Sequence, residues 1–240
     1  MKPRKSSQSP DFLGPKNNKF LRLGVLFSGG KDSCLALHKT IKQGHEICVL
    51  LSILPENFDS YMFHKPYLNL LKKQAEELGI KLITVKSRGV KEEELDDLKE
   101  LLKKSDEIEG IAVGGIASNY QGERVKKICD DLGLKFIAPL LGYKPEDVWK
   151  ELFEEGFEVI LTKTACDGFG REWIGKIIDE KEFLKLKKLS ERYKFRLDFE
   201  GGEAESAVLY MPEFRERIEI DFEIASEGRY RHFIRLINVK

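Results

Sequence analysis

The sequence lacks paired cysteines and long apolar runs. Its four cysteines, Cys34, Cys48, Cys129 and Cys166, form no C-x-x-C pair, which argues against a zinc knuckle or a thioredoxin-like redox site. No stretch approaches the roughly 18 apolar residues that a membrane helix needs. Nothing resembles a signal peptide, because the first apolar run comes only after Lys19. We therefore expect a cytoplasmic protein that does not enter a membrane.

The sequence also lacks an excess of charge of either sign. Lysine and arginine together number 41, and aspartate and glutamate together number 41. Because nucleic-acid-binding domains usually carry net basic charge, nucleic acid is not expected as a partner. Hydrophobic residues make up 41% of the chain, which is close to the globular norm and predicts a packed core.

Short apolar runs alternate with helical patterns along most of the chain. Residues 1–18 are polar, contain three prolines, and are expected to be a disordered leader. Six runs that we expect to be strands then alternate with helices, at 21–27, 46–53, 81–86, 110–114, 135–139 and 158–162. This order predicts an α/β fold with a doubly wound, mostly parallel sheet covered on both faces. After residue 163 β signals dominate, so we expect an α/β domain at 19–163 and a small α+β domain at 164–240.

The strongest motif is the hexapeptide 28–33, SGGKDS, between a predicted strand and a predicted helix. Two adjacent glycines permit backbone angles closed to other residues, so successive N–H groups can point into one concavity. The helix adds free N–H donors and the positive end of its dipole, which together predict a phosphate site. Lys31 can add positive charge, and Asp32 can hold Mg²⁺ or cap the helix. The plainer alternative is a Gly-Gly turn with a serine cap.

This hexapeptide is not a Walker A loop. The nearest alignment places Val25 where the first glycine should stand and Asp32 where Ser or Thr should hold the metal. The loop instead resembles the PP-loop of the N-type ATP pyrophosphatases. That resemblance implies that it grips pyrophosphate and that ATP is cleaved between its α- and β-phosphates.

Two further motifs carry polar residues near glycines. Residues 114–121, GGIASNYQ, follow the fourth predicted strand, at the carboxyl edge of the sheet where ligands bind in such folds. Its polar side chains suit a base, a ribose or a substrate, or simply a capped turn. Residues 200–206, EGGEAES, place three carboxylates around a Gly-Gly turn. Such a turn suits a metal, an ammonium or a cationic ligand, unless it is a solvated acidic turn.

In this order, the three motifs resemble the diphthine–ammonia ligase (diphthamide synthetase) family of the PP-loop superfamily. The resemblance runs from about residue 21 to residue 220. The family usually reads EGGEYET, whereas Ala204 and Ser206 replace the tyrosine and the threonine here, and Gly122 stands where an arginine is common. The resemblance implies an adenine nucleotide alpha hydrolase-like fold of the HUP type.

The resemblance implies an ATP-dependent amide-forming ligase that acts on elongation factor 2. Diphthine, ammonia and ATP would give diphthamide, AMP and pyrophosphate through an acyl-adenylate, with Mg²⁺ as a cofactor; a homodimer is left open. Lys31 and Asp32 would act in catalysis, and Asp32 would also bind the metal. The implied ATP-binding residues are Ser28, Gly29, Gly30, Lys31, Asp32, Ser33, Ser52, Gly115 and Ser118. The implied substrate-binding residues are Asn119, Tyr120, Gln121, Gly201, Gly202, Glu203 and Glu205.

Two alternatives are kept beside this hypothesis. The first is a tRNA-modifying PP-loop enzyme, although thiolases of that kind generally carry the paired cysteines that this sequence lacks. The second is a non-catalytic nucleotide-binding protein, which would need neither the EGGEAES turn nor the β-rich segment. Formation of AMP from ATP and Mg²⁺ distinguishes this second alternative from an enzyme.

Overall fold

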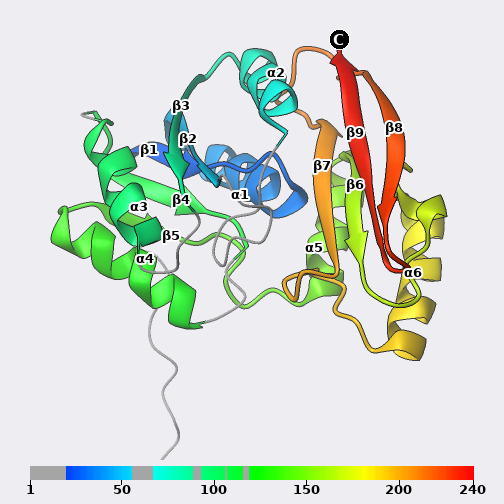
Figure 1. The fold of residues 1–240 in the computed structure, drawn as a ribbon. Coiled ribbons are helices and arrows are strands. Elements are labelled where there is room, and N and C mark those ends of the chain that lie inside the picture. The colour runs from blue at the N-terminus through cyan, green and yellow to red at the C-terminus, as the bar shows by residue number, and fades with distance from the viewer. Residues whose placement is uncertain (1–19, 56–66, 89–92, 106, 116–118) are drawn as a thin grey trace, which may run out of the picture.

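The computed structural model describes residues 20–55, 67–88, 93–105, 107–115 and 119–240. These residues form two sheets that lie side by side (Figure 1). The first sheet has five strands in the order β3-β2-β1-β4-β5, and the second has four in the order β7-β6-β9-β8. The expected α/β class with a β-rich C-terminal part is confirmed.

All strand pairs of the first sheet are parallel. Its strands are β1 (Arg22–Leu26), β2 (Glu46–Pro55), β3 (Lys81–Ser87), β4 (Gly110–Val113) and β5 (Lys135–Ile137), and the helices between them are α1 (Lys31–Lys42), α2 (Leu68–Leu78), α3 (Glu93–Lys103) and α4 (Asn119–Asp131). The chain moves outward from β1 to β3 and then returns to β4 on the other side of β1. This reversal creates a switch point beside the carboxyl end of β1, where open α/β sheets bind ligands.

Helices cover both faces of the first sheet, and each face has its own core. On one face, Val25 and Leu50 pack in a cluster with buried residues of α1 and α2. On the other face, Val49 and Leu51 pack in a cluster with buried residues of α3 and α4. Successive side chains of a strand point to opposite faces, so a strand covered on both sides must be apolar throughout.

The second sheet is antiparallel and contains β6 (Glu158–Ala165), β7 (Ala204–Tyr210), β8 (Ile220–Glu227) and β9 (Arg231–Val239). We expected residues 158–162 to form the sixth strand of the parallel sheet, and this is wrong. They belong to β6, which pairs with β7 and β9. The apolar run Val159–Leu161 shows that the strand is buried, but burial does not identify its neighbours. The expected domain limit after residue 163 falls inside β6, and the two expected domains stay a prediction.

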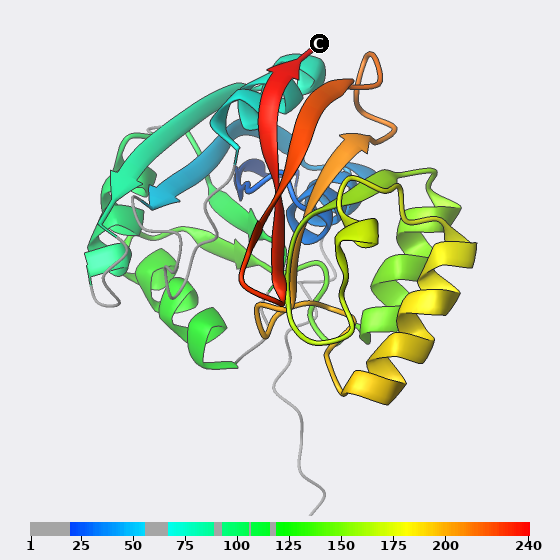
Figure 2. The same cartoon turned by 45° about the vertical axis from the view of Figure 1, so that its right-hand side comes forward.

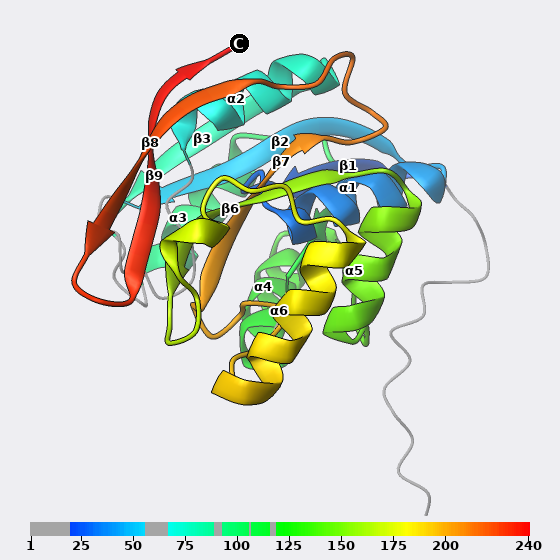
Figure 3. The same cartoon turned by 90° about the vertical axis from the view of Figure 1, so that its right-hand side faces the viewer.

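Two helices pack against each other beside the second sheet. Helices α5 (Pro145–Glu154) and α6 (Glu180–Tyr193) lie side by side, and η1 (Arg171–Trp173) is a short turn before α6 (Figures 2 and 3). Trp149 of α5 is fully buried, lies 5.4 Å from the ring of Phe183 on α6, and donates a hydrogen bond of 2.9 Å to the Leu197 carbonyl. These contacts fix the segment that leads to the EGGEAES motif.

A buried histidine makes a link between the two parts. His38 of α1 lies 2.7 Å from a Glu213 oxygen and 3.1 Å from a Glu155 oxygen. The hydrogen bond with Glu213 raises the pKa of His38, although burial opposes this. The resulting contact connects α1 to the loop after β7.

Among the described residues, no helix is long and apolar enough to cross a membrane.

Candidate active site

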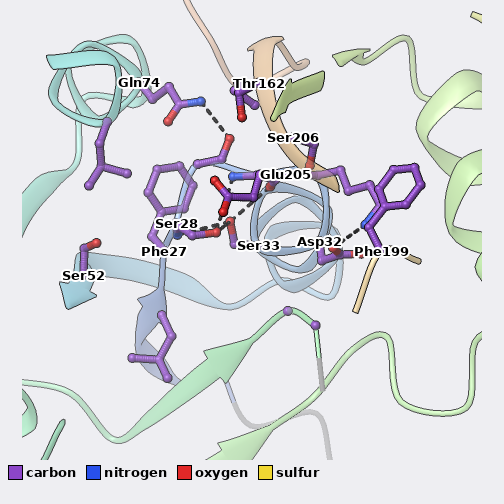
Figure 4. A pocket seen from close by; sticks show the side chains of 18 of the residues that line it. Phe27, Ser28, Asp32, Ser33, Ser52, Gln74, Thr162, Phe199, Glu205 and Ser206 are labelled. Carbon is purple, nitrogen blue, oxygen red and sulfur yellow. Dashed lines mark hydrogen bonds and ion pairs between the residues drawn. The ribbon is translucent and has the colours of Figure 1, made fainter. Parts of the chain in front are cut away.

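A cavity of about 270 Å³ lies where the two sheets meet (Figure 4). The hexapeptide 28–33 forms one wall, together with the carboxyl ends of β1, β2 and β4. Tyr67 and residues of α2 form a second wall, and residues 198–200 and 204–207 close the cavity from the other part of the chain. Three segments that are far apart in the sequence therefore line one site.

The first glycine of the loop is held in a conformation that suits glycine alone. Gly29 has a φ of 74°, and its carbonyl accepts hydrogen bonds from the Val208 N–H at 3.0 Å and from Gln74 Nε2 at 2.9 Å. Gln74 Nε2 also donates to the Val208 carbonyl at 2.8 Å. A β-carbon on Gly29 would lie 2.0 Å from Gln74 Oε1. The loop is thus shaped by α2 and β7 as well as by its own glycines.

Helix α1 begins at Lys31, directly after the two glycines, so its positive end adjoins the cavity. The Ser33 hydroxyl supports this turn: its Oγ donates to the Gly30 carbonyl at 3.1 Å and accepts from the Ser28 N–H at 3.3 Å. Gly30 is the N-cap residue and has no side chain to cap the helix. The capping role considered for Asp32 is therefore wrong, because Asp32 lies within the first turn.

The ammonium group of Lys31 contacts neighbouring groups of the protein. Its side chain is 2% exposed, and Nζ lies 2.6 Å from an Asp32 oxygen and 2.7 Å from the Asp198 carbonyl. Nζ also lies 5.2 Å from the centre of the Phe199 ring. Asp32 is more exposed, with 25% of its side chain accessible. This placement favours Lys31 as a residue that positions Asp32, while its predicted role in catalysis stays a prediction.

Asp198 and Glu200 add carboxylates to the cavity wall near Asp32. Burial would raise the pKa of Asp198, but hydrogen bonds from Arg196 and the Glu200 N–H hold it below its usual value. A β-carbon on Gly115 would lie 2.4 Å from a Glu200 oxygen and 3.6 Å from the Asp32 β-carbon. Glu200 and Asp32 therefore both lie close to Gly115.

The two glutamates proposed for substrate binding have different surroundings. Glu205 lines the cavity, and its carboxylate lies 2.8 Å from Lys163 Nζ, with both side chains 16% exposed. Glu203 does not line the cavity, since its oxygens accept from the Arg196 N–H at 3.1 Å and the Gly201 N–H at 2.9 Å. Gly201 and Gly202 are also absent from the lining residues. The structure thus brings Glu205, but not Glu203, into the site.

Of the other residues predicted to bind ATP or substrate, some line the cavity and some lie outside the described part of the chain. Ser52, within β2, and Gly115, just after β4, both line the cavity, and their role in ATP binding stays a prediction. Ser118 lies outside the described residues. Residues Asn119–Gln121 begin α4, and their side chains are likewise outside the described part of the chain. Their proposed contacts stay predictions.

Sequence reasoning missed several residues of the cavity wall, among them the polar residues Gln74, Asp198, Glu200 and Ser206. Glu200 and Ser206 are the first and last residues of the EGGEAES motif, so the motif itself was a usable signal. Gln74 has no comparable signal, because it lies in an ordinary amphipathic helix. Its role depends on carbonyl groups 45 and 134 residues away.

Asp32 and Glu200 are the acidic residues best placed to hold a metal ion. Mg²⁺ is commonly bound through one or two carboxylates and the phosphates of a nucleotide. Asp32 and Glu200 both lie close to Gly115 and line the cavity beside the hexapeptide 28–33, which fits this arrangement. Among the described residues there is no cluster of three or more histidine, cysteine or acidic side chains, so the geometry does not suit an all-protein metal centre.

The cysteines are poorly suited to nucleophilic chemistry. Burial raises the pKa of the Cys129 thiol to about 12 and that of Cys166 to about 11. Burial also raises the pKa of Cys34 and of Cys48. Because the thiolate is the reactive form, these surroundings disfavour a cysteine nucleophile at neutral pH.

Comparison with known proteins gives consistent matches over nearly the whole described chain. The family model for the diphthamide synthase N-terminal domain matches residues 21–136, and the model for the C-terminal domain matches residues 144–238. The chain is 33% identical to the diphthine–ammonia ligase of Rattus norvegicus, over 84% of this chain and 83% of the relative. The Homo sapiens relative of the same name is 31% identical over the same shares, and that of Danio rerio is 33% identical over 84% and 87%.

The similarity to solved structures is weaker. A predicted subunit of tRNA methyltransferase from Methanocaldococcus jannaschii aligns with a TM-score of 0.44 and 19% identity, over 80% of this chain and 98% of that one. A similarity of this size supports no inference about function.

Proposed function

The chain belongs to the diphthamide synthase family, and from this premise we propose how its cavity makes an amide from a carboxylate, ammonia and ATP. The protein is an ATP-dependent ligase of diphthamide biosynthesis. In the complete reaction, diphthine, ammonia and ATP give diphthamide, AMP and pyrophosphate. Diphthine is a modified histidine of elongation factor 2, so the acceptor is a protein, and we infer a cytoplasmic location from that partner.

One observation carries this proposal: the SGGKDS loop and the EGGEAES motif line the same cavity. The first motif suits phosphate, and the second supplies acidic side chains for a cationic substrate. They lie about 170 residues apart in the sequence, and β7 brings them into contact. A nucleotide-binding protein without catalysis needs the first motif alone.

The chemistry requires activation of the carboxylate, because a carboxylate oxygen is a poor leaving group for attack by ammonia. Attack by the carboxylate on the α-phosphate of ATP forms an acyl-adenylate and releases pyrophosphate, and ammonia then displaces AMP. The N–H groups of the loop and the positive end of α1 would stabilise the negative charge that develops on pyrophosphate. This step needs no covalent bond to the protein.

Asp32 and Glu200 would hold Mg²⁺ beside the phosphates. A bound Mg²⁺ would neutralise charge on the leaving pyrophosphate. Lys31 fixes the carboxylate of Asp32 from the buried side, through the contact of 2.6 Å. That contact occupies one carboxylate oxygen of Asp32. The Asp32 side chain is partly exposed, so it can be reached from the cavity.

The decisive experiment is mass analysis of the modified histidine after incubation with protein, ATP, Mg²⁺ and ammonium. The expected result is a mass change equal to replacement of a hydroxyl group by an amino group. The same incubation without ATP should leave the histidine unchanged. A histidine that stays unmodified in the complete mixture would contradict the proposal.

The nucleotide products provide a separate prediction. Because the loop fits a pyrophosphatase type and not a Walker A type, ATP should yield AMP and pyrophosphate in equal amounts. Chromatography of the nucleotides and an assay of pyrophosphate measure this directly. Stoichiometric ADP and phosphate would show that the loop has been assigned to the wrong class.

We predict that Glu205→Gln weakens binding of the diphthine-modified protein. The diphthine side chain carries a quaternary ammonium, and the gross attraction to one carboxylate is about 4 kcal/mol at 4 Å and an effective dielectric of 20. Desolvation and the competing Lys163 reduce this, so we expect Kd to rise about tenfold, equivalent to ~1.4 kcal/mol. Titration with the modified elongation factor gives this value, and ATP affinity should change little.

Glu203→Gln is the matched control, because it removes the same charge two residues earlier from a side chain that does not line the cavity. Its effect on binding of the modified protein should be clearly smaller. If the two variants weaken binding equally, the effect belongs to the charge of the whole turn and not to Glu205.

A further inference from the structure

We propose that Ser206 is a pyrophosphate-binding residue of the ATP site, although it lies 175 residues from Lys31. This inference rests on the proposed function, because it assumes that the loop holds the phosphates of ATP. It adds to the phosphate loop a hydroxyl from β7, a strand of the second sheet.

The Ser206 side chain is already bonded to a donor of the phosphate loop. Its Oγ accepts the backbone N–H of Lys31 at 3.1 Å, and Ser206 lines the cavity. Lys31 is the first residue of α1, so this N–H is one of the donors without a partner inside the helix, from which a helix N-terminus builds an anion site. A β-carbon on Gly30 would lie 3.2 Å from the Ser206 carbonyl and 3.4 Å from Oγ, so the hydroxyl is in close contact with the glycine turn.

The position of this hydroxyl is fixed before any ligand arrives. On one side, β7 bonds to the loop through the Val208 N–H and the Gly29 carbonyl, and Gln74 joins the same two residues. On the other side, β7 pairs with β6, with Ser206 opposite Leu161. A donor held in place by its scaffold needs little reorganisation when charge develops beside it.

The chemistry of a hydroxyl allows both interactions at once. Ser206 Oγ can accept from the Lys31 N–H with one lone pair while donating its own proton to a phosphate oxygen. In this arrangement the hydroxyl links the N–H group at the helix N-terminus to the phosphate by two successive hydrogen bonds. A hydrogen bond to a charged acceptor is stronger than one between neutral groups. We therefore expect removal of the hydroxyl to weaken pyrophosphate binding about tenfold.

Calorimetric titration of Ser206→Ala with Mg²⁺-pyrophosphate, and separately with AMP, tests the role of this hydroxyl. The expected result is a Kd for pyrophosphate about tenfold higher and a Kd for AMP within about twofold of the unchanged protein, since AMP lacks the pyrophosphate group. Ser206→Thr keeps the hydroxyl and should restore pyrophosphate binding. An unchanged or tighter affinity of Ser206→Ala for pyrophosphate would overturn the assignment.

Two further outcomes of these titrations also test the proposed role of Ser206. If Ser206→Ala loses affinity for both ligands and unfolds at a lower temperature, Ser206 serves the shape of the loop and not the ligand, and the proposal is overturned. If the unchanged protein itself fails to bind pyrophosphate, the fault lies in the proposed function of the loop. Titration of the unchanged protein therefore separates failure of the proposed function from failure of the inference about Ser206.

Discussion

Asp32→Asn is expected to lower kcat by at least about 100-fold, which corresponds to ~2.7 kcal/mol of lost transition-state stabilisation. The amide is close in shape to the carboxylate and can still accept a hydrogen bond from Lys31 Nζ, so the loop should keep its form. It loses the charge with which we propose that Asp32 holds Mg²⁺ beside the leaving pyrophosphate. Release of AMP at several Mg²⁺ concentrations measures kcat and its metal dependence together.

The control for Asp32→Asn must remove a comparable ion pair elsewhere. Glu151 lies 2.6 Å from Lys39 Nζ, both side chains are about one-fifth exposed, and neither residue lines the cavity. Glu151→Gln should therefore lose about as little thermal stability as Asp32→Asn, and its kcat should be nearly normal. If Asp32→Asn also keeps a normal kcat and an unchanged Mg²⁺ dependence, Asp32 is structural and the metal is held elsewhere.

Gly29→Ala is expected to destabilise the protein by about 3 kcal/mol and to weaken ATP binding at least tenfold. A residue with a β-carbon costs ~1 to 2 kcal/mol at a φ of 74°. The new β-carbon would lie 2.0 Å from Gln74 Oε1, so Gln74 must move and give up its bonds to Gly29 and Val208. Those two bonds contribute about 1 kcal/mol each. Urea unfolding and ATP titration measure the two effects.

Gly79→Ala separates backbone strain from the clash with Gln74. Gly79 has a φ of 66°, and a β-carbon there would meet no atom within 4 Å. It ends α2, away from the cavity lining. We expect a loss of only ~1 to 2 kcal/mol and normal ATP binding. If Gly29→Ala is no worse than Gly79→Ala in either measurement, the contact between the loop and Gln74 has no energetic importance.

The local architecture of the phosphate site could be predicted from the sequence. A buried strand, two glycines and an amphipathic helix follow one another in the chain, and each follows from neighbouring residues alone. Gly115 comes just after the end of β4, and parallel strands of one sheet end at the same edge, so its place near the loop follows from the fold class. Ser52 lies within β2 and was named only through the family resemblance.

The acidic turn shows where such reasoning stops. Glu203 and Glu205 are both glutamates of the EGGEAES motif with only Ala204 between them, yet only Glu205 lines the cavity. The difference depends on the Gly201 and Arg196 N–H groups, which bind Glu203, and on Lys163, which faces Glu205 from β6. Glu203 lies in the turn before β7, where no fixed side-chain period applies and direction follows from hydrogen bonds, whereas Glu205 lies within β7 opposite Lys163 of β6.

The sequence by itself determined the fold class, the strand–glycine–helix form of the 28–33 loop and the family, because these depend on periodicity, on glycine at a tight turn and on motifs in a fixed order. Tertiary structure decided that β6 joins the second sheet, that Lys31 Nζ donates to the Asp198 carbonyl, and that Gln74 and Ser206 complete the loop. Apolar periodicity reports that a segment is buried but not which segment covers it. Hydrogen bonds between residues far apart in the chain leave no local pattern, so only the folded chain reveals them.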